Sequence, residues 1–308
     1  MSRVAAIDCG TNSIRLLIAE VSDDGLRDVT RRMEIVRLGQ GVDRTGRFAE
    51  DALQRTFAAL EEYAAAIAGA QVDRVRMVAT SATRDAANRD VFIDGVRQRL
   101  GVEPDVVSGD EEAQLSFAGA TAELLRGGSH WPAPYLVCDI GGGSTEFVVG
   151  GPDGVQAAMS YDIGCVRMTE RHLHDDPPTP DQIAQATADI DAAIAAADNA
   201  VGVRTARTLV GLAGSVTTVA AIALGLSAYD PERIHHAQIS ADQVHAVTES
   251  LLGASHEQRA ALPVMHPGRV DVIGAGALVL DRIMARGGFD TVVVSEHDIL
   301  DGIALSIS

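Results

Sequence analysis

The chain has 308 residues, enough for two domains of ordinary size, and 46% of them are apolar, so a full hydrophobic core is possible. Its 43 acidic and 25 basic side chains give a formal net charge of −18, which repels nucleic acid and anionic membranes, so we expect no DNA partner and no membrane association. No apolar run approaches the roughly 20 residues that cross a bilayer, and the N-terminus MSRVAAIDCG lacks the apolar core of a signal peptide. Three cysteines are too few for a disulfide framework. We therefore expect a cytoplasmic protein.

The first half of the chain alternates predicted strands and helices. Apolar runs at 3–9 and 14–21 flank the polar sequence DCGTNS, which predicts strand, turn and strand. Apolar residues at helical spacing predict a helix over 50–69. A strand, a polar loop and a helix follow over 74–101, and then a short strand and a helix that begins near 108–110.

The second half begins after the Gly- and Pro-rich segment 126–134, a predicted domain boundary. A second hairpin follows, and Thr179 predicts the N-cap of a long helix. The sequence after this helix predicts a strand, a glycine turn and a helix. A further predicted helix contains Gly274 and Gly276, which allow close packing. The chain then ends in a predicted strand, a polar turn and a helix.

This order of elements predicts two lobes. We expect an N-terminal lobe over 1–125, which the last helix at about 298–308 can rejoin, and a C-terminal lobe over 126–297. Strands and helices alternate in both, so the predicted fold class is α/β.

The chain also contains an internal repeat. DCGTNS (8–13) and DIGGGS (139–144) share Asp, Gly and Ser in register, and each lies between two apolar strands. A predicted Gly-Asp type turn follows each hairpin's second strand, SDDG in the first copy and GPDG in the second. Two such hairpins, each opening an α/β half, predict a duplicated domain with a cleft between the copies.

Both loops suit a phosphate ligand. A glycine turn lets backbone amides converge on an anion without obstruction by a Cβ atom. Asp8 and Asp139 repel phosphate by themselves, so we expect them to hold a divalent cation, Mg²⁺. The sequence has no lysine, which excludes a Walker A loop, so phosphates must be bound by amides, hydroxyls, arginine and metal. One such loop alone is more often a plain turn; the pair favours phosphate binding.

Six motifs occur in an order that is typical of one protein family. They are AAIDCGTNSIRLLIAEV, VATSATRDAAN, SGDEEAQLSFAGA, VCDIGGGSTEFVVG, LVGLAGSVTTVAAIALG and RVDVIGAGALVLDRIM. Through them the chain resembles, over essentially its whole length, the exopolyphosphatase/guanosine pentaphosphate phosphatase family. The resemblance implies two duplicated ribonuclease H-like (actin-like ATPase) domains with an interdomain cleft, from the actin–hexokinase–Hsp70 superfamily, in the short two-domain form.

The resemblance implies attack of water on a terminal phosphoanhydride phosphorus. It assigns the catalytic carboxylate to Glu112, the second Glu of EEA, while Glu111 either assists or faces solvent. Without the resemblance, both glutamates are also explained as ordinary acidic residues at a helix N-terminus.

The resemblance also assigns residues to the substrate phosphates and to the metal. Arg84 and Asn88 are four apart and are expected on one helix face, where Arg84 either faces phosphate or pairs with a nearby aspartate. Arg15 either joins them or points outward. The expected phosphate-binding residues are Gly10, Thr11, Asn12, Ser13, Thr80, Arg84, Asn88, Gly141, Gly142, Gly143, Ser144, Thr145, Gly214, Ser215 and Arg269. The expected metal ligands are Asp8, Asp139 and Glu146.

We expect a hydrolase that releases terminal orthophosphate from inorganic polyphosphate, with a bias towards short chains because the accessory domains of longer relatives are missing, or from guanosine pentaphosphate. The alternatives are an ATP-dependent kinase of the same fold and a non-catalytic sensor of polyphosphate or guanosine tetra- and pentaphosphate. SGDEEA fits a water-directed glutamate better than the aspartate base of a sugar kinase. Family members are often homodimers, but the sequence identifies no interface.

Histidines at 172, 174, 235 and 236 lack a completing ligand set at a recognised spacing, so no metal site is predicted from them.

Overall fold

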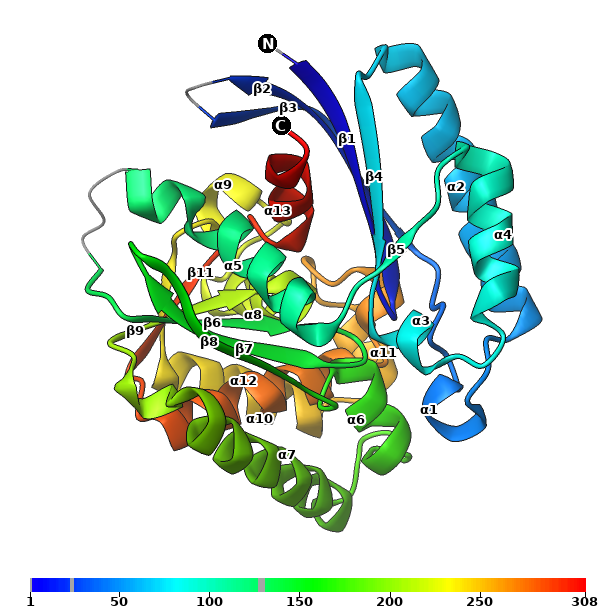
Figure 1. The fold of residues 1–308 in the computed structure, drawn as a ribbon. Coiled ribbons are helices and arrows are strands. Elements are labelled where there is room, and N and C mark those ends of the chain that lie inside the picture. The colour runs from blue at the N-terminus through cyan, green and yellow to red at the C-terminus, as the bar shows by residue number, and fades with distance from the viewer. Residues whose placement is uncertain (1, 23–24, 127–130) are drawn as a thin grey trace. The chain divides into compact units, whose positions relative to one another are not determined.

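The computed structural model describes residues 2–22, 25–126 and 131–308 (Figure 1) and divides into two compact units. Unit 1 consists of Met1–Gly119 and Asp298–Ser308, and unit 2 of Ala120–His297. The division falls within helix α5 (Gly109–Arg126). Residues 127–130 of the segment predicted as a boundary lie outside the described part, so the predicted domain limits stay a prediction.

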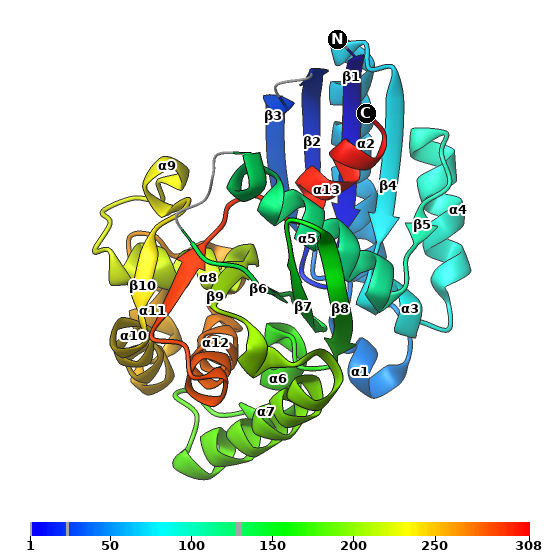
Figure 2. The ribbon, with the colours of Figure 1, turned by 60° about the vertical axis from the view of Figure 1, so that its left-hand side comes forward.

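Unit 1 is built on a five-stranded sheet of order β3-β2-β1-β4-β5, and Figure 2 shows β3, β2, β1 and β4 side by side. The strands are β1 (Ser2–Cys9), β2 (Ser13–Ser22), β3 (Gly25–Ile35), β4 (Arg74–Ala79) and β5 (Asp105–Val106). β1 pairs antiparallel with β2 and parallel with β4, so the predicted hairpin occupies the centre of the sheet.

The central strand β1 is buried on both faces. Ala5 and Ile7 join a core with α2 (Glu50–Ala70) and α4 (Arg89–Leu100), while Val4 and Ala6 join a core with α13 (Ile299–Ser306). Figure 1 shows α2 and α4 on one side of β1 and β4 and α13 on the other. A strand covered on both faces needs an apolar residue at every position, which explains the continuous run VAAI. Two short helices, α1 (Val42–Thr45) and α3 (Ser81–Asp85), complete the unit.

Helix α13 is held to unit 1 by charge and by close packing. The Asp298 side chain caps it by accepting from the Leu300 amide at 3.0 Å and also binds Arg15, while Arg31 binds Asp301 at 2.5 Å. A Cβ atom at Gly302 would lie 1.9 Å from the carbonyl oxygen of Leu115 on α5. The two helices therefore approach at a distance that only glycine allows.

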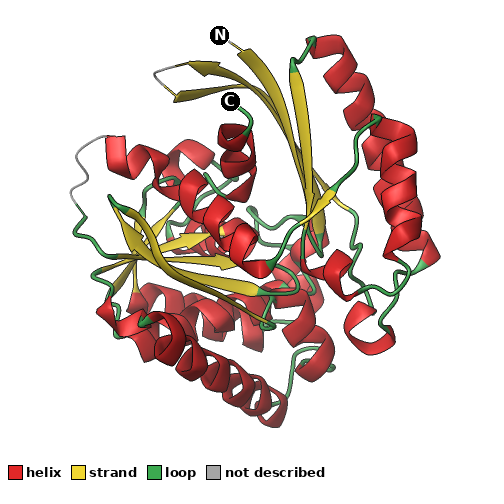
Figure 3. Ribbon diagram, in the orientation of Figure 1, coloured by secondary structure: helices red, strands yellow, loops and turns green. Residues whose placement is uncertain are grey.

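Unit 2 is built on a six-stranded sheet of order β10-β11-β9-β6-β7-β8, with long helices packed along it (Figure 3). The strands are β6 (Tyr135–Ile140), β7 (Thr145–Gly151), β8 (Gly154–Tyr161), β9 (Thr208–Leu212), β10 (Gln238–Ser240) and β11 (Thr291–Val294). The helices are α6 (Cys165–His172), α7 (Pro180–Val201), α8 (Ala213–Ala223), α9 (Pro231–Ile234), α10 (Ala241–Gly253), α11 (His256–Ala260) and α12 (Ile273–Gly287), with 3₁₀ turns at Val203–Thr205 and Pro267–Arg269.

The two sheets repeat one topology. In each, the first strand (β1 or β6) pairs antiparallel with the second (β2 or β7) and parallel with the fourth (β4 or β9), and a further parallel strand follows (β5 or β11). The prediction of an α/β fold made of two similar halves is confirmed.

Local signals in the sequence are confirmed in several places. Thr179 forms a capping box with Gln182 at the start of α7, and the GPDG turn joins β7 to β8. A Cβ atom at Gly276 would lie 2.2 Å from Ser215 Oγ, so this glycine packs closely as predicted. The predicted SDDG turn contains residues 23–24, which lie outside the described residues.

Replacing Gly302 by Ala tests the packing of α13 on α5. The added Cβ would overlap the Leu115 carbonyl oxygen, so we expect the variant to lose about 1–3 kcal/mol of unfolding free energy in urea denaturation. Gly69→Ala is the matched control, because among the described residues nothing lies within 4 Å of a Cβ there, and alanine in a helix gains up to about 1 kcal/mol. Equal urea midpoints for Gly302→Ala and wild type would contradict this packing.

Candidate active site

The first hairpin ends in a turn closed by the Gly10 amide, which donates to the Ser13 carbonyl at 2.9 Å. The carbonyls of Thr11 and Asn12 already accept hydrogen bonds from the backbone amides of residues 36, 37 and 39, at 2.8–3.1 Å. Among the described residues, no acceptor binds the amides of Thr11 and Asn12. The turn therefore presents two backbone donors to a ligand.

The second hairpin repeats this arrangement with different partners. The Gly141 amide donates to the Ser144 carbonyl at 3.1 Å, and the carbonyls of Gly141, Gly142 and Gly143 accept from backbone amides of residues 164–167 at 2.8–3.2 Å. The start of α6 thus saturates the carbonyls. In the described part of the chain the amides of Gly142 and Gly143 donate to no protein atom.

Two contacts hold the second turn against α6. A Cβ atom at Gly164 would lie 2.4 Å from both C and O of Gly142, so only glycine fits there. Arg167, which is 8% exposed, donates from Nε to the Gly143 carbonyl at 2.8 Å. Sequence reasoning missed both residues, because neither belongs to a recognised ligand pattern.

The carboxylate of the first hairpin is neutralised within the protein. β-Sheet register places Arg15 opposite Asp8, and its Nε and Nη2 bind Asp8 Oδ2 at 3.0 and 2.6 Å. Arg15 also binds Asp298, so it bridges two buried carboxylates. Burial raises the pKa of Asp8, an effect that Arg15 opposes. Burial also disfavours the charged form of Asp298, but the adjacent Arg15 holds its pKa below the usual value. Neither expectation for Arg15, a contact with phosphate or an outward orientation, included this pairing with Asp8 and Asp298.

The second hairpin brings two carboxylates together instead. The register of β6 and β7 places Glu146 directly opposite Asp139. Glu146 is 1% exposed and Asp139 is 7% exposed. Ser160 donates to Glu146 Oε1 at 2.8 Å. Directly opposed residues on antiparallel strands have Cβ atoms about 4.5–5.5 Å apart, where like charges repel. Two carboxylates and a nearby hydroxyl are the oxygen donors that Mg²⁺ prefers, so these residues fit such an ion.

The threonine hydroxyls of the two turns bind protein atoms. Thr11 Oγ1 lies 2.9 Å from Ser81 Oγ, which ties the first turn to the start of α3 beside Thr80. Thr145 Oγ1 donates to the Ile163 carbonyl at 3.0 Å. These bonds leave the backbone amides as the better candidates for contacts with phosphate.

The adjacent glutamates of α5 have different surroundings. The Glu112 side chain is 10% exposed and accepts from Arg84 Nη1 at 2.6 Å. The Glu111 side chain is 47% exposed and pairs with Arg76 at 2.8 Å. Arg84 Nη1 also donates to the Val107 carbonyl at 3.0 Å, which positions it over the start of α5. Glu112 therefore has a fixed, shielded carboxylate, whereas Glu111 lies in solvent.

The prediction that Arg84 and Asn88 share a helix face is wrong. Helix α3 ends at Asp85, and Asn88 precedes the next helix as its N-cap residue. The Asn88 amide exchanges two hydrogen bonds with the backbone of Phe48, at 2.8 and 3.1 Å. These bonds join two segments of unit 1, which is a structural role.

The third glycine turn lies beside an arginine. Arg269 Nη2 occupies the space that a Cβ atom at Gly214 would take, at 2.3 Å, and Nη1 donates to Thr218 Oγ1 at 3.3 Å. Ser215 packs against Gly276 at the same end of α8. The structure thus brings Gly214, Ser215 and Arg269 together in unit 2.

The chain as a whole is similar to known proteins. A family model described as the Ppx/GppA phosphatase family matches residues 17–307. The chain belongs to the Ppx/GppA phosphatase family.

Several members of the family are close to this chain. It is 50% identical to a Mycobacterium tuberculosis protein named exopolyphosphatase 2, over all of this chain and 99% of that protein. The crystal structure of an exopolyphosphatase-like protein is 46% identical, with a TM-score of 0.96 over 100% of this chain and 98% of that one. A Photobacterium profundum protein named guanosine-5'-triphosphate,3'-diphosphate pyrophosphatase is 34% identical over 64% of this chain and 37% of that protein.

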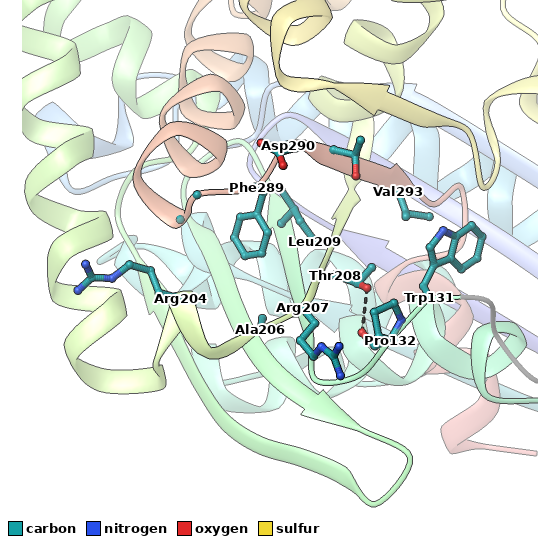
Figure 4. A pocket seen from close by; sticks show the side chains of 13 residues that line it. Trp131, Pro132, Arg204, Ala206, Arg207, Thr208, Leu209, Phe289, Asp290 and Val293 are labelled. Carbon is teal, nitrogen blue, oxygen red and sulfur yellow. Dashed lines mark hydrogen bonds between the residues drawn. The ribbon is translucent and has the colours of Figure 1, made fainter.

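Unit 2 of this Ppx/GppA protein also has a pocket of about 330 Å³ (Figure 4). Trp131, Arg207, Phe289 and Asp290 line it, at the amino ends of β9 and β11. In the same unit, residues 141–143 and 214–215, which were expected to bind phosphate, follow the opposite, carboxyl ends of β6 and β9, where α/β proteins usually bind ligands. None of them lines the pocket.

None of the described helices combines the length and hydropathy that a bilayer-spanning segment needs.

Arg167→Met tests whether Arg167 holds the second turn. We expect the amides of Cys165 and Val166, which bind the turn's carbonyls at 2.9 and 2.8 Å, to exchange with deuterium about tenfold faster in the variant. Arg259→Met is the control: Arg259 is 7% exposed and donates to the Ala254 carbonyl at 2.9 Å elsewhere in unit 2. Equal acceleration at 165–166 in both variants would mean general destabilisation.

Proposed function

We propose that this chain is a metal-dependent phosphohydrolase that releases terminal orthophosphate from inorganic polyphosphate, guanosine pentaphosphate or both. The observation that carries the proposal is the shared construction of the two turns. In each, protein amides bind carbonyls of the turn, and two amides of the turn have no acceptor among the described residues, as a nest for phosphate oxygens requires. The relative named exopolyphosphatase 2 favours polyphosphate, and the relative named for guanosine-5'-triphosphate,3'-diphosphate favours the nucleotide.

Glu112 directs the attacking water. Its carboxylate takes a proton from water while the water oxygen bonds to the terminal phosphorus, and the bond from phosphorus to the bridging oxygen breaks. The shortened chain leaves with that oxygen, and orthophosphate is the second product. Arg84, bound to Glu112 at 2.6 Å, orients the carboxylate and places a cation near the phosphoryl oxygens.

Asp139 and Glu146 are the proposed ligands of Mg²⁺, which when bound neutralises charge on the phosphate oxygens. Asp8 fits this role less well, because Arg15 already binds its Oδ2. Arg15 and Asp8 instead keep the base of the first turn rigid and electrically neutral. With a net charge of −18, the protein attracts an extended polyanion only through its local donors, so we propose a preference for short polyphosphate.

A phosphate-release assay tests the proposal on short and long polyphosphate, guanosine pentaphosphate and ATP, with and without Mg²⁺ and without an added acceptor. Release from polyphosphate or guanosine pentaphosphate without an acceptor supports a hydrolase. Phosphate transfer that requires an acceptor would instead identify a kinase, and binding without turnover a sensor.

Glu112→Gln tests the catalytic carboxylate in the same assay. The amide keeps an oxygen for Arg84 but takes no proton from water, so kcat should fall by about 10²–10⁴-fold with little change in ligand affinity. Glu111→Gln, the neighbouring solvent-exposed residue, is the matched control and should retain wild-type turnover. Near-normal turnover of Glu112→Gln would reject the assignment.

Glu146→Gln tests the metal ligands. Removing one of two carboxylates should raise the Mg²⁺ concentration for half-maximal activity by at least about tenfold. Asp8→Asn should lower kcat but leave that concentration near its wild-type value, because Asp8 binds Arg15. An unchanged Mg²⁺ requirement in Glu146→Gln would remove these residues from the metal site.

A further inference from the structure

Three side chains of metal-binding type converge in unit 2, and none of them belongs to the proposed active site. Glu123 comes from α5, His235 from the end of α9, and His297 from the segment before α13. His235 Nε2 lies 3.0 Å from Glu123 Oε2, and His297 Nδ1 lies 3.7 Å from Glu123 Oε1. One ligand atom from each residue lies within 4.8 Å of the others.

Backbone hydrogen bonds hold the two histidine segments together. The His236 amide donates to the Val294 carbonyl at 2.7 Å, and the Val294 amide donates to the Ala237 carbonyl at 2.9 Å. Ser295 Oγ accepts from the His297 amide at 3.1 Å and donates to the His297 carbonyl at 2.7 Å. His236 has a positive φ of 61°, a strained conformation for a residue other than glycine. The loops are therefore built to keep both imidazoles in place.

A simple hydrogen-bonded pair does not explain the cluster, and another pair in the same unit shows the difference. His172 and Asp189 also lie 3.0 Å apart, and the histidines of the two pairs have nearly equal side-chain exposure, 19% and 20%. The third group beside Asp189 is Arg171 at 3.7 Å, a cation that repels metals. The third group beside Glu123 is a second imidazole at the same distance.

We propose that Glu123, His235 and His297 bind one transition-metal ion of the zinc class. Two imidazole nitrogens and one carboxylate suit Zn²⁺, Co²⁺ or Ni²⁺, whereas Mg²⁺ prefers the all-oxygen environment of Asp139 and Glu146. Zinc ligands lie about 2.0–2.2 Å from the ion. The His235 and Glu123 atoms at 3.0 Å are already close enough to share one ion, so only the wider separations in the cluster, which reach at most 4.8 Å, must shorten. The Glu123 and His297 side chains are 48% and 32% exposed, which gives them room to move and gives the ion access from solvent.

Metal binding moves the His235 proton from one ring nitrogen to the other, with no net release of a proton. The Glu296 amide donates to His235 Nδ1 at 3.2 Å, so the metal-free imidazole carries its proton on Nε2 and donates it to Glu123. When the ion takes the Nε2 lone pair, that proton leaves to solvent and Nδ1 acquires one, at the expense of the long bond from Glu296. Three metal–ligand bonds replace two hydrogen bonds in this exchange.

The location gives the site a structural role. A bound ion would fasten the C-terminal part of α5 to the segment that ends at His297. The chain enters unit 2 through the first of these segments, at residues 119–120, and leaves it after the second, at residues 297–298. We therefore expect metal to stabilise unit 2 rather than to take part in phosphate release.

Co²⁺ titration of the metal-free full-length chain tests this site, because Co²⁺ bound to histidine at low coordination number absorbs visible light. We expect one equivalent to bind, Zn²⁺ to displace it, and Zn²⁺ to raise the melting temperature. His297→Gln should lose at least about tenfold in affinity, and His235→Gln should behave alike. His172→Gln, the matched control, should bind as wild type.

Three results would overturn the proposal. They are the absence of a Co²⁺ band at one equivalent, an unchanged band in His297→Gln, and loss of the band in Glu146→Gln, which would assign the ion to the other site. His297 is one-third exposed, so its variant should melt like the metal-free wild type and report on binding rather than folding.

Discussion

A carboxylate stays charged inside a protein only when a cation or hydrogen-bond donors compensate it, and both hairpins are organised around this constraint. Asp8, Asp139 and Glu146 are all less than a tenth exposed. In unit 1 the strand register supplies Arg15, which binds Asp8 and Asp298 together. In unit 2 the equivalent register supplies Glu146, a second acid. The same backbone therefore carries an arginine opposite the acid in one copy and a second acid, the other proposed Mg²⁺ ligand, in the other.

This difference shows how a duplicated fold divides its tasks. The turns themselves are alike. Each closes with one hydrogen bond from a Gly amide to a Ser carbonyl, and in each the carbonyls accept hydrogen bonds from backbone amides of another segment. The segment that donates these hydrogen bonds differs: it is residues 36–39 in unit 1 and the start of α6 in unit 2. The backbone geometry that suits phosphate is thus retained in both units, while the side chains opposite the acids have diverged.

Much of the fold follows from short-range patterns in the sequence. The apolar runs around the two DxGxxS loops predicted β1, β2, β6 and β7, and Thr179 marked the start of α7. Strand β3 was not predicted, because most of its residues are exposed and polar and leave little apolar alternation to detect. Asn88 was misplaced because a short helix ends between it and Arg84, which spacing alone does not reveal.

The candidate site was less accessible to sequence reasoning. The sequence motifs identified the two turns and Glu112. The partners of the charged groups, however, depend on sheet register and on packing between segments that are far apart in the sequence. Asp298 pairs with Arg15 although most of the sequence lies between them. Glu123 likewise comes close to His235 and His297 only when the unit folds. A ligand set spread in this way has no recognisable spacing, so the histidine pair at 235–236 gave no signal of a metal site.

The cations that bind Asp8, Glu112 and Asp301 are all guanidinium groups, and the sequence has no lysine to replace them. A guanidinium keeps its charge at every pH at which a protein stays folded. Side chains of this protein consequently offer no primary amine to acetylating enzymes or to amine-reactive reagents. A single lysine introduced on an exposed helix would be the one side-chain amine of the molecule, a unique position for a fluorophore or a surface linker.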